Sequence, residues 1–260
     1  MCYDIAKLKS RLKKQGQRKG HTPKEIEETI KDYERIWRGE QVLFSGFAHP
    51  ELPVIVRQDG RYTTELMTWG LVPSYINEPK KAAEVMNMTI NCQAETAFEK
   101  ASFKASIRHF RGLLPINGWF EHHHVNGKPF PYYIHDAEDE LLYLGCIYSM
   151  WYNPVMSKEE ATFSIVTTKG NDLLTRIHNK PAKSQGPRMP LILSGDAVME
   201  WLHPDTDMNT LKEIMITFPD DMLDAYTVKP IRTKGVDAFS ESVIEPHRYP
   251  ELDTEQLSLF

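Results

Sequence analysis

Two patterns of hydrophobic and polar residues divide the chain after about its first forty positions. In the earlier part, apolar residues recur every three or four positions over residues 26–37, which is the spacing of one helix face. Thr22, Pro23 and Glu25 precede this stripe as an N-cap, a first helical residue and the partner in a capping box. The pattern predicts a helical segment over about residues 5–40.

The later part alternates short runs of β-branched and aromatic residues with proline and glycine, which is typical of strands separated by turns. Asn126-Gly127 between two such runs predicts a β-hairpin. The predicted strands are LPVIV, YTTELMTWGLV, RGLLPI, PYYIH, LLYLGCIYSMW, TFSIVTT, MPLIL and YTVKPI. The predicted helices are Ala94–Phe110, Asp172–His178, Gly195–Trp201 and Thr210–Ile216.

Many strands with a few interspersed helices predict an α+β fold: a single domain with a largely antiparallel β-sheet or open barrel core and peripheral helices. We expect this domain to span residues 1–246, because the chain shows no internal repeat and no low-complexity linker. Residues 247–260 are polar and carry few core-forming side chains, so they are predicted to form a flexible C-terminal tail.

Composition and charge narrow the function classes. The hydrophobic fraction of 41% and the charged fraction of 26% are ordinary for a globular protein. The net charge is −5, so affinity for a polyanion must come from local patches. One such patch is the run from Lys7 to Lys19, whose seven basic and no acidic residues predict either a nucleic-acid contact or a solvated helix face.

The three cysteines are Cys2, Cys92 and Cys146. An odd number at wide spacings makes a poor disulfide framework and matches no zinc-binding motif, which indicates a reducing compartment. Cys92 and Cys146 have apolar neighbours and are expected to be buried. The chain shows neither a signal sequence nor an apolar run long enough to cross a bilayer, so we expect a cytoplasmic protein.

Cys2 suggests a specific chemistry. Its small side chain permits removal of Met1, which leaves an α-amine and a thiol on adjacent carbons, with ordinary pKa values of about 7.7–8.0 and ~8.5. Such an amine condenses with an aldehyde to an imine, and the thiol then closes a five-membered thiazolidine ring. The alternative is that Cys2 is only a tolerated small residue.

Three more residues are candidates for proton transfer or positioning. Glu121 follows two aromatic residues in LLPINGWFEHHH, where partial burial is expected to raise the carboxyl pKa toward neutrality. Asn91 lies at the start of a predicted helix in INCQAET, and His178 ends another. Each also has a structural alternative: Asn91 as a helix cap, Glu121 facing solvent on a hairpin, and His178 at a helix C-terminus.

The run His122–His124 is not expected to bind metal. Alternate residues of a strand face opposite sides, so only His122 and His124 can converge, and no third ligand is evident. We expect these histidines on the surface of the hairpin, and we expect no cofactor.

Six features occur in a fixed order: an N-terminal Met-Cys, WGLVPS, Asn-x-x-Ala-Glu-Thr, LLPxxGWFE, IVTT…IH and RMP. Together they resemble the SOS response-associated peptidase (SRAP) family, from Cys2 to about Ile231. The basic helical segment and an insertion between His178 and Arg188 interrupt the match. Members of that family bind single-stranded DNA and crosslink covalently to abasic sites. The resemblance implies the SRAP fold, a role in the DNA damage response, and a bacterial protein associated with the nucleoid at replication forks.

The resemblance also implies roles for individual residues. Cys2 matches the crosslinking residue, and Asn91 matches an asparagine that positions the N-terminal residue and the sugar. Glu121 and His178 match the acid–base residues, and the histidine also bears on reversal of the crosslink. Because Cys2 is consumed in each event, the implied activity is peptidase-like or lyase-like chemistry limited to a single turnover.

The implied DNA-binding residues include surfaces that wedge against bases beside the lesion. These matching positions are Pro50 and, in WGLVPS, Trp69, Gly70 and Pro73. Gln93 stands where the family usually has an arginine that grips phosphate.

The chain departs from the family beside its nucleophile, where Tyr3-Asp4 replaces the usual Gly-Arg. With Gln93, this removes two cations from the expected phosphate path and should flatten the salt dependence of binding. Arg188 and the segment Lys7–Lys19 are predicted substitutes.

Three function hypotheses follow. The first is a protein that crosslinks abasic sites in single-stranded DNA through Cys2. The second is an N-terminal-nucleophile cysteine peptidase or amidohydrolase that uses the same thiol. The third is a non-enzymatic scaffold whose function lies in its tail.

The tail ends in QLSLF, which resembles the short peptide by which bacterial repair proteins dock on the DNA polymerase sliding clamp. Leu257, Leu259 and Phe260 are the predicted apolar anchors, and Gln256 is predicted to fix their register. Folding of the tail back onto its own domain is the alternative.

Overall fold

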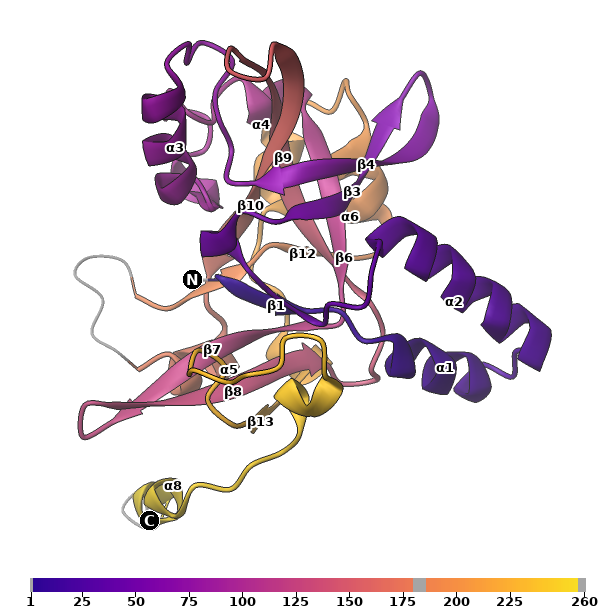
Figure 1. Ribbon diagram of the computed structural model, residues 1–260, viewed down its shortest axis with the longest axis vertical. Coiled ribbons are helices and arrows are strands. Elements are labelled where there is room, and N and C mark those ends of the chain that lie inside the picture. The colour runs from indigo at the N-terminus through magenta and orange to yellow at the C-terminus, as the bar shows by residue number, and fades with distance from the viewer. Residues whose placement is uncertain (1, 180–185, 257–260) are drawn as a thin grey trace.

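The computed structural model describes residues 2–179 and 186–256, and side chains up to residue 253. Helices surround two β-sheets, and α1 and α2 project together from one side (Figure 1). The helices of at least six residues are α1 Lys9–Arg18, α2 Pro23–Trp37, α3 Pro79–Met88, α5 Asp172–Ile177, α6 Asp196–Leu202, α7 Met208–Ile214 and α8 Pro250–Gln256. The shorter ones are α4 Ser106–His109, η1 Gly46–Ala48, η2 Ala94–Thr96, η3 Asp220–Met222 and η4 Glu241–Ile244.

The first sheet has five strands in the order β13-β8-β7-β1-β2, and all its pairings are antiparallel. Its strands are β1 Asp4–Ala6, β2 Leu43–Ser45, β7 Gly118–Val125, β8 Lys128–Asp136 and β13 Leu223–Thr227. The predicted hairpin joins β7 to β8, and both turn residues, Asn126 and Gly127, have positive φ angles, as a type I′ turn requires.

The second sheet has eight strands and contains the only parallel pairings of the described residues, β10 with β4 and β10 with β5. Its strands are β3 Glu51–Gln58, β4 Arg61–Trp69, β5 Asn91–Gln93, β6 Arg111–Ile116, β9 Leu142–Asn153, β10 Lys158–Lys169, β11 Arg188–Pro190 and β12 Ile192–Leu193. The predicted α+β fold with a largely antiparallel core is therefore confirmed.

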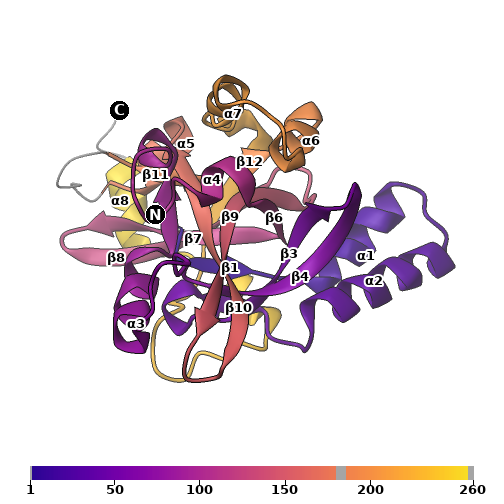
Figure 2. The same ribbon diagram turned by 90° about the horizontal axis from the view of Figure 1, so that it is seen from above.

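Hydrophobic residues from both sheets and from α2 form the largest core cluster, which includes Cys2, Trp37, Trp69 and Trp119. A second cluster joins the eight-stranded sheet to α6 and α7, which lie together on one side of the molecule (Figure 2). Burial of large apolar side chains at about 1.5–3 kcal/mol each is the main force that holds these layers together.

The helical segment near the N-terminus begins as its sequence predicts. Thr22 accepts a hydrogen bond from the Glu25 amide, and the Glu25 carboxylate accepts one from the Thr22 amide. Three of the five cations of α1 bind other parts of the chain: Lys9 pairs with Glu34, Arg11 pairs with Asp139, and Arg18 donates to the Glu138 carbonyl. This pattern favours a docked helix over a nucleic-acid contact.

Three predictions of local structure were wrong. The segment predicted as one helix over Ala94–Phe110 holds only η2, turns and α4, because three of its apolar residues, Ala97, Phe103 and Ile107, are drawn into the second core cluster. Helix α3 was not predicted. The strand predicted in YTVKPI ends at Thr227, because Pro230 lacks an amide donor and the chain turns there.

The predicted boundary at residue 246 stays a prediction. Residues just beyond it still contact the domain: the His247 amide donates to Thr227, and the Tyr249 hydroxyl donates to the Val228 carbonyl.

Candidate active site

Strand β1 fixes the start of the chain inside the five-stranded sheet, between β7 and the edge strand β2. Ile5 lies opposite Phe44 of β2 on one side and opposite Trp119 of β7 on the other. Cys2 lies three residues before Ile5, the first residue of β1 that pairs with β7, and its side chain is fully buried.

Asn91 holds Cys2 from the other sheet. Its side-chain Nδ2 donates to the Cys2 carbonyl at 2.9 Å. The residue lies in β5, opposite Ile165 of β10, and not at the start of a helix as predicted. Because Asn91 lies in a strand, its side-chain amide caps no helix and is available to bind Cys2. The second amide atom, Asn91 Oδ1, is buried and has no hydrogen-bond partner among the described residues.

Glu121 and His178 form a hydrogen-bonded pair. Glu121 lies in β7 with 4% of its surface exposed, and its Oε2 is 2.8 Å from His178 Nδ1. His178 is the C-cap of α5, as the sequence predicted, and Asn171 caps the other end of that helix by accepting from the Leu174 amide. The helix thus carries the imidazole to the carboxylate.

The expected rise in the pKa of Glu121 is wrong. Burial does favour the neutral carboxyl, but the hydrogen bond from His178 and nearby positive charge outweigh it, so the pKa lies below its ordinary value. The opposite holds for Cys2: burial, and then the negative charge of Glu121, raise the pKa of its thiol. The thiol and the carboxylate therefore interact electrostatically, and Glu121 is ionised at neutral pH.

A latch made by two β7 residues and Asn179 holds the end of α5. The Asn179 side chain accepts from the His124 amide at 2.7 Å and donates to the His124 carbonyl at 2.8 Å. His123 Nδ1 lies 3.0 Å from the Ile177 carbonyl. Since His178 lies between these anchored residues, the latch fixes the imidazole beside Glu121. The sequence analysis placed His123 and His124 on the surface without this role, and Asn179 was missed because a single asparagine after a helix has no distinctive pattern.

The wedge residues predicted from the resemblance differ in exposure. Pro50 is half-buried, whereas Trp69, Gly70 and Pro73 are buried. The Trp69 indole stacks on Phe163 and donates to the Ile90 carbonyl. It therefore packs in the core and is not exposed on the surface. The exposed aromatic residues nearest in sequence are Phe47 and Tyr75, which the sequence analysis did not single out.

Arg188 is not free to bind a DNA phosphate in place of the two missing cations. Only 5% of its side chain is exposed, and Nη1 and Nη2 both bind the Glu95 carboxylate at 2.8 Å. Gln93, in β5, is half-buried. The negative partner and the burial leave Arg188 little capacity for a DNA phosphate.

Several predicted features lie apart from these residues or outside the structure. Gln256 ends α8. The other predicted clamp-binding residues, Leu257, Leu259 and Phe260, lie outside the described residues. The described residues contain no cluster of three or more histidine, cysteine or acidic residues that could hold a metal ion. None of the described helices is both long and apolar enough to span a membrane.

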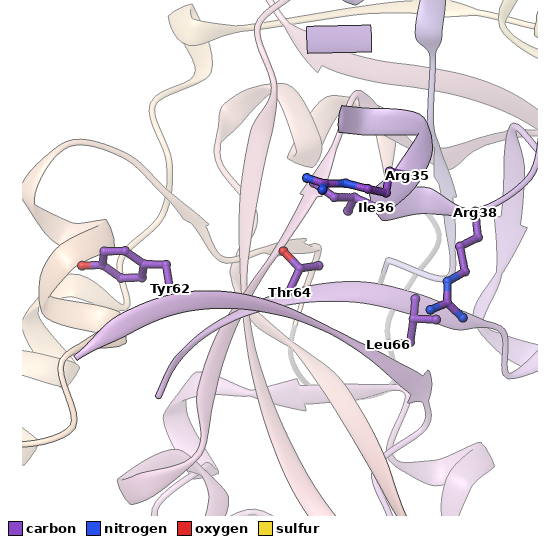
Figure 3. A pocket seen from close by; sticks show the side chains of 6 residues that line it. All are labelled: Arg35, Ile36, Arg38, Tyr62, Thr64 and Leu66. Atoms are coloured by element: carbon purple, nitrogen blue, oxygen red, sulfur yellow. The ribbon is translucent and has the colours of Figure 1, made fainter. Parts of the chain in front are cut away.

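A hollow of about 380 Å³ lies between the end of α2 and β4 (Figure 3). Its lining residues are Arg35, Ile36, Arg38, Tyr62, Thr64 and Leu66, and none of them is a predicted site residue. It is therefore separate from the group formed by Cys2, Asn91, Glu121 and His178.

Several known proteins resemble this chain in sequence or in fold. A protein from Bacteroides thetaiotaomicron with a crystal structure is 27% identical, has a TM-score of 0.78, and the match covers 95% of this chain and all of that one. The abasic site processing protein YoqW of Bacillus subtilis is 28% identical over 202 residues, which cover 74% of this chain and 84% of YoqW. The abasic site processing protein HMCES of Xenopus tropicalis is 31% identical over 52% of this chain and 44% of its own length.

The sequence profile of one family, SOS response associated peptidase (SRAP), matches residues 18–232. The match covers most of the chain. It includes Asn91, Glu121 and His178 but begins after Cys2. The chain belongs to the SRAP family.

Proposed function

We propose that this protein captures abasic sites in single-stranded DNA by forming a thiazolidine between Cys2, exposed by removal of Met1, and the open-chain sugar aldehyde. The observation that carries the proposal is that Asn91 donates to the Cys2 carbonyl while the Glu121–His178 pair lies close enough for the Glu121 charge to raise the pKa of the Cys2 thiol. The names of relatives as abasic site processing proteins support the same substrate.

The reaction divides into two bond-forming steps. The Cys2 amine first adds to the C1′ aldehyde and loses water, which gives an imine. The thiol then adds across the C=N bond, so that sulfur bonds to C1′ and the thiol proton ends on nitrogen. Holding the amine, the thiol and the sugar in one site makes these steps effectively unimolecular. No free aldehyde remains to allow strand breakage by β-elimination.

Because Glu121 is ionised, it acts first as a base. An ionised carboxylate accepts a proton, so Glu121 acts as a base toward the amine or thiol of Cys2 and can return the proton to the departing hydroxyl. His178 donates to this carboxylate and supplies the second proton-transfer group. The unpartnered Asn91 Oδ1 is placed to accept a hydrogen bond from the sugar or from the new amine.

The test is to incubate the protein with a single-stranded oligonucleotide that contains one abasic site. We expect a heat-stable adduct of one protein per strand, which is lost in Cys2→Ala and retained in Cys92→Ala, a matched variant at another buried cysteine. An adduct of equal yield in Cys2→Ala, or a mature protein that retains Met1 and still crosslinks, contradicts the proposal.

The alternative is an N-terminal-nucleophile peptidase that uses the same thiol. Such enzymes activate the nucleophile by a base within hydrogen-bonding distance of it. In the described residues His178 binds Glu121, and the Cys2 thiol has no hydrogen bond to the imidazole. The names of the relatives as abasic site processing proteins support the crosslinking reaction better. Release of amine from unstructured peptides, lost in Cys2→Ala, is the result that favours the peptidase.

We also propose that the tail docks on a bacterial sliding clamp through Gln256, Leu257, Leu259 and Phe260. The support is the QLSLF sequence alone, in which apolar anchors follow a glutamine. Deletion of Leu259 and Phe260 is expected to abolish binding to purified clamp without changing adduct formation. Unchanged clamp binding after the deletion contradicts this role.

A further inference from the structure

Asp4 lies beside the nucleophile, where the resemblance leads one to expect a cation. Its carboxylate, only 4% exposed, accepts hydrogen bonds from a single guanidinium, that of Arg232. The bond from Arg232 Nε is 2.9 Å, and Nη2 donates to the same oxygen. Arg232 comes from the segment after β13, 228 residues further along the chain. A buried carboxylate thus brings a distant cation to the start of β1.

The Arg232 guanidinium is not used up by this pair. Its side chain is 49% exposed, and Nη1 has no hydrogen bond to any described residue. The guanidinium carbon lies 5.7 Å from the centre of the Phe47 ring. That ring is 50% exposed, and its other neighbour is Tyr3, with ring centres 4.8 Å apart. A surface cation and a surface aromatic ring therefore lie side by side next to Cys2.

The charge of Arg232 acts on residues that flank the reacting groups. Burial is the main cause of the raised pKa of Tyr3, and the positive charge of Arg232 opposes that rise. Burial also lowers the pKa of His122, and Arg232 adds to that effect. Tyr3 follows Cys2 and His122 follows Glu121, so the guanidinium lies near the residues of the candidate active site.

We propose that Arg232 and Phe47 form a nucleotide-binding patch for the strand that carries the lesion, an inference that rests on the proposed function. Arg232 Nη1 binds a backbone phosphate, and a base next to the abasic site stacks on Phe47. Asp4 is the positioning residue, because its carboxylate holds the other two guanidinium nitrogens. In this chain the patch supplies the cation that is absent at position 4.

The test measures binding of an abasic-free oligothymidylate between 50 and 200 mM salt by fluorescence anisotropy, which avoids covalent capture. Loss of one phosphate contact is expected to make the slope of log K against log salt shallower by about 0.7 in Arg232→Gln. Arg232→Lys is expected to keep the slope. Lys13→Gln removes one exposed cation from α1 and is the matched control, with the wild-type slope.

Phe47→Ala separates stacking from charge. It is expected to weaken binding by about fivefold or more, with an unchanged salt slope. Since Arg232→Gln leaves the buried Asp4 carboxylate without its partner, the double variant Asp4→Asn/Arg232→Gln removes the pair without leaving that charge. The double variant is expected to show the same shallow slope.

Adduct formation with abasic DNA at saturating concentration distinguishes failure of this inference from failure of the proposed function. Wild-type adducts together with wild-type slopes in Arg232→Gln and in the double variant overturn the patch and leave the proposed function intact. A shallow slope in both variants without any wild-type adduct supports the patch and overturns the crosslinking reaction.

Discussion

Replacing Glu121 by glutamine tests the candidate active site most directly. The substitution keeps the shape of the side chain and an oxygen that can accept from His178, so the fold is expected to persist. It removes a buried negative charge that lies within a 2.8 Å hydrogen bond of the imidazole and acts on the Cys2 thiol. One change thus alters both the proton-transfer pair and the nucleophile.

The substitution is expected to slow adduct formation but to speed alkylation of the Cys2 thiol. A hydrogen bond to a charged group contributes about 1.5–3 kcal/mol, which corresponds to about 10- to 150-fold in rate, and positioned acid–base groups contribute roughly 10²–10⁴-fold. Adduct formation in Glu121→Gln is therefore expected to slow by about 10²-fold or more. Because Glu121 raises the pKa of the Cys2 thiol, its neutralisation is expected to lower that pKa and to speed alkylation of Cys2 by iodoacetamide.

The assay follows both rates in one preparation of mature protein: single-turnover adduct formation on gels, and alkylation of Cys2 by mass spectrometry. Glu99→Gln, at an exposed glutamate, is the control and should change neither rate. A Glu121→Gln variant that crosslinks within threefold of wild type refutes the acid–base role. Faster alkylation of the buried Cys92 and Cys146 together with slower crosslinking indicates a damaged fold instead.

Three further predictions concern the latch, acid stability and the helical segment. Asn179→Ala removes both hydrogen bonds to His124 and is expected to slow adduct formation about tenfold with unchanged DNA affinity; a displaced NMR signal of the His178 ring with an unchanged urea midpoint distinguishes positioning from loss of fold. Because the folded-state pKa of Glu121 lies below the ordinary 4.5, its stabilisation is full above that pH and is lost as the pH falls through the folded value, so urea unfolding of wild type and Glu121→Gln should converge only in acid. Thr22→Ala breaks the capping box of α2 and should lower the free energy of unfolding by about 1 kcal/mol; an unchanged urea midpoint contradicts that role.

The sequence was sufficient to predict features that depend only on residues close together in the chain. The capping box at Thr22 and the turn at Asn126-Gly127 depend only on neighbouring residues, and both form as predicted. The segment Ala94–Phe110 failed because contacts with distant strands override its helical spacing.

The candidate site shows the same division. Cys2, Asn91, Glu121 and His178 were found through motifs. The lowered pKa of Glu121 could not be predicted, because it depends on an imidazole 57 residues away in sequence. Arg232 was likewise invisible to any local pattern, since only the folded sheet brings it to Asp4.

The interior position of β1 has a consequence for maturation. The strand is paired on both sides, by β2 and by β7, and Cys2 is fully buried at its start. An aminopeptidase needs an extended, accessible substrate, so under the proposed function we expect Met1 to be removed from the nascent chain, before residues 118–125 emerge and pair with β1. Processing and folding would then compete in time, and the proposed reaction would require that processing come first.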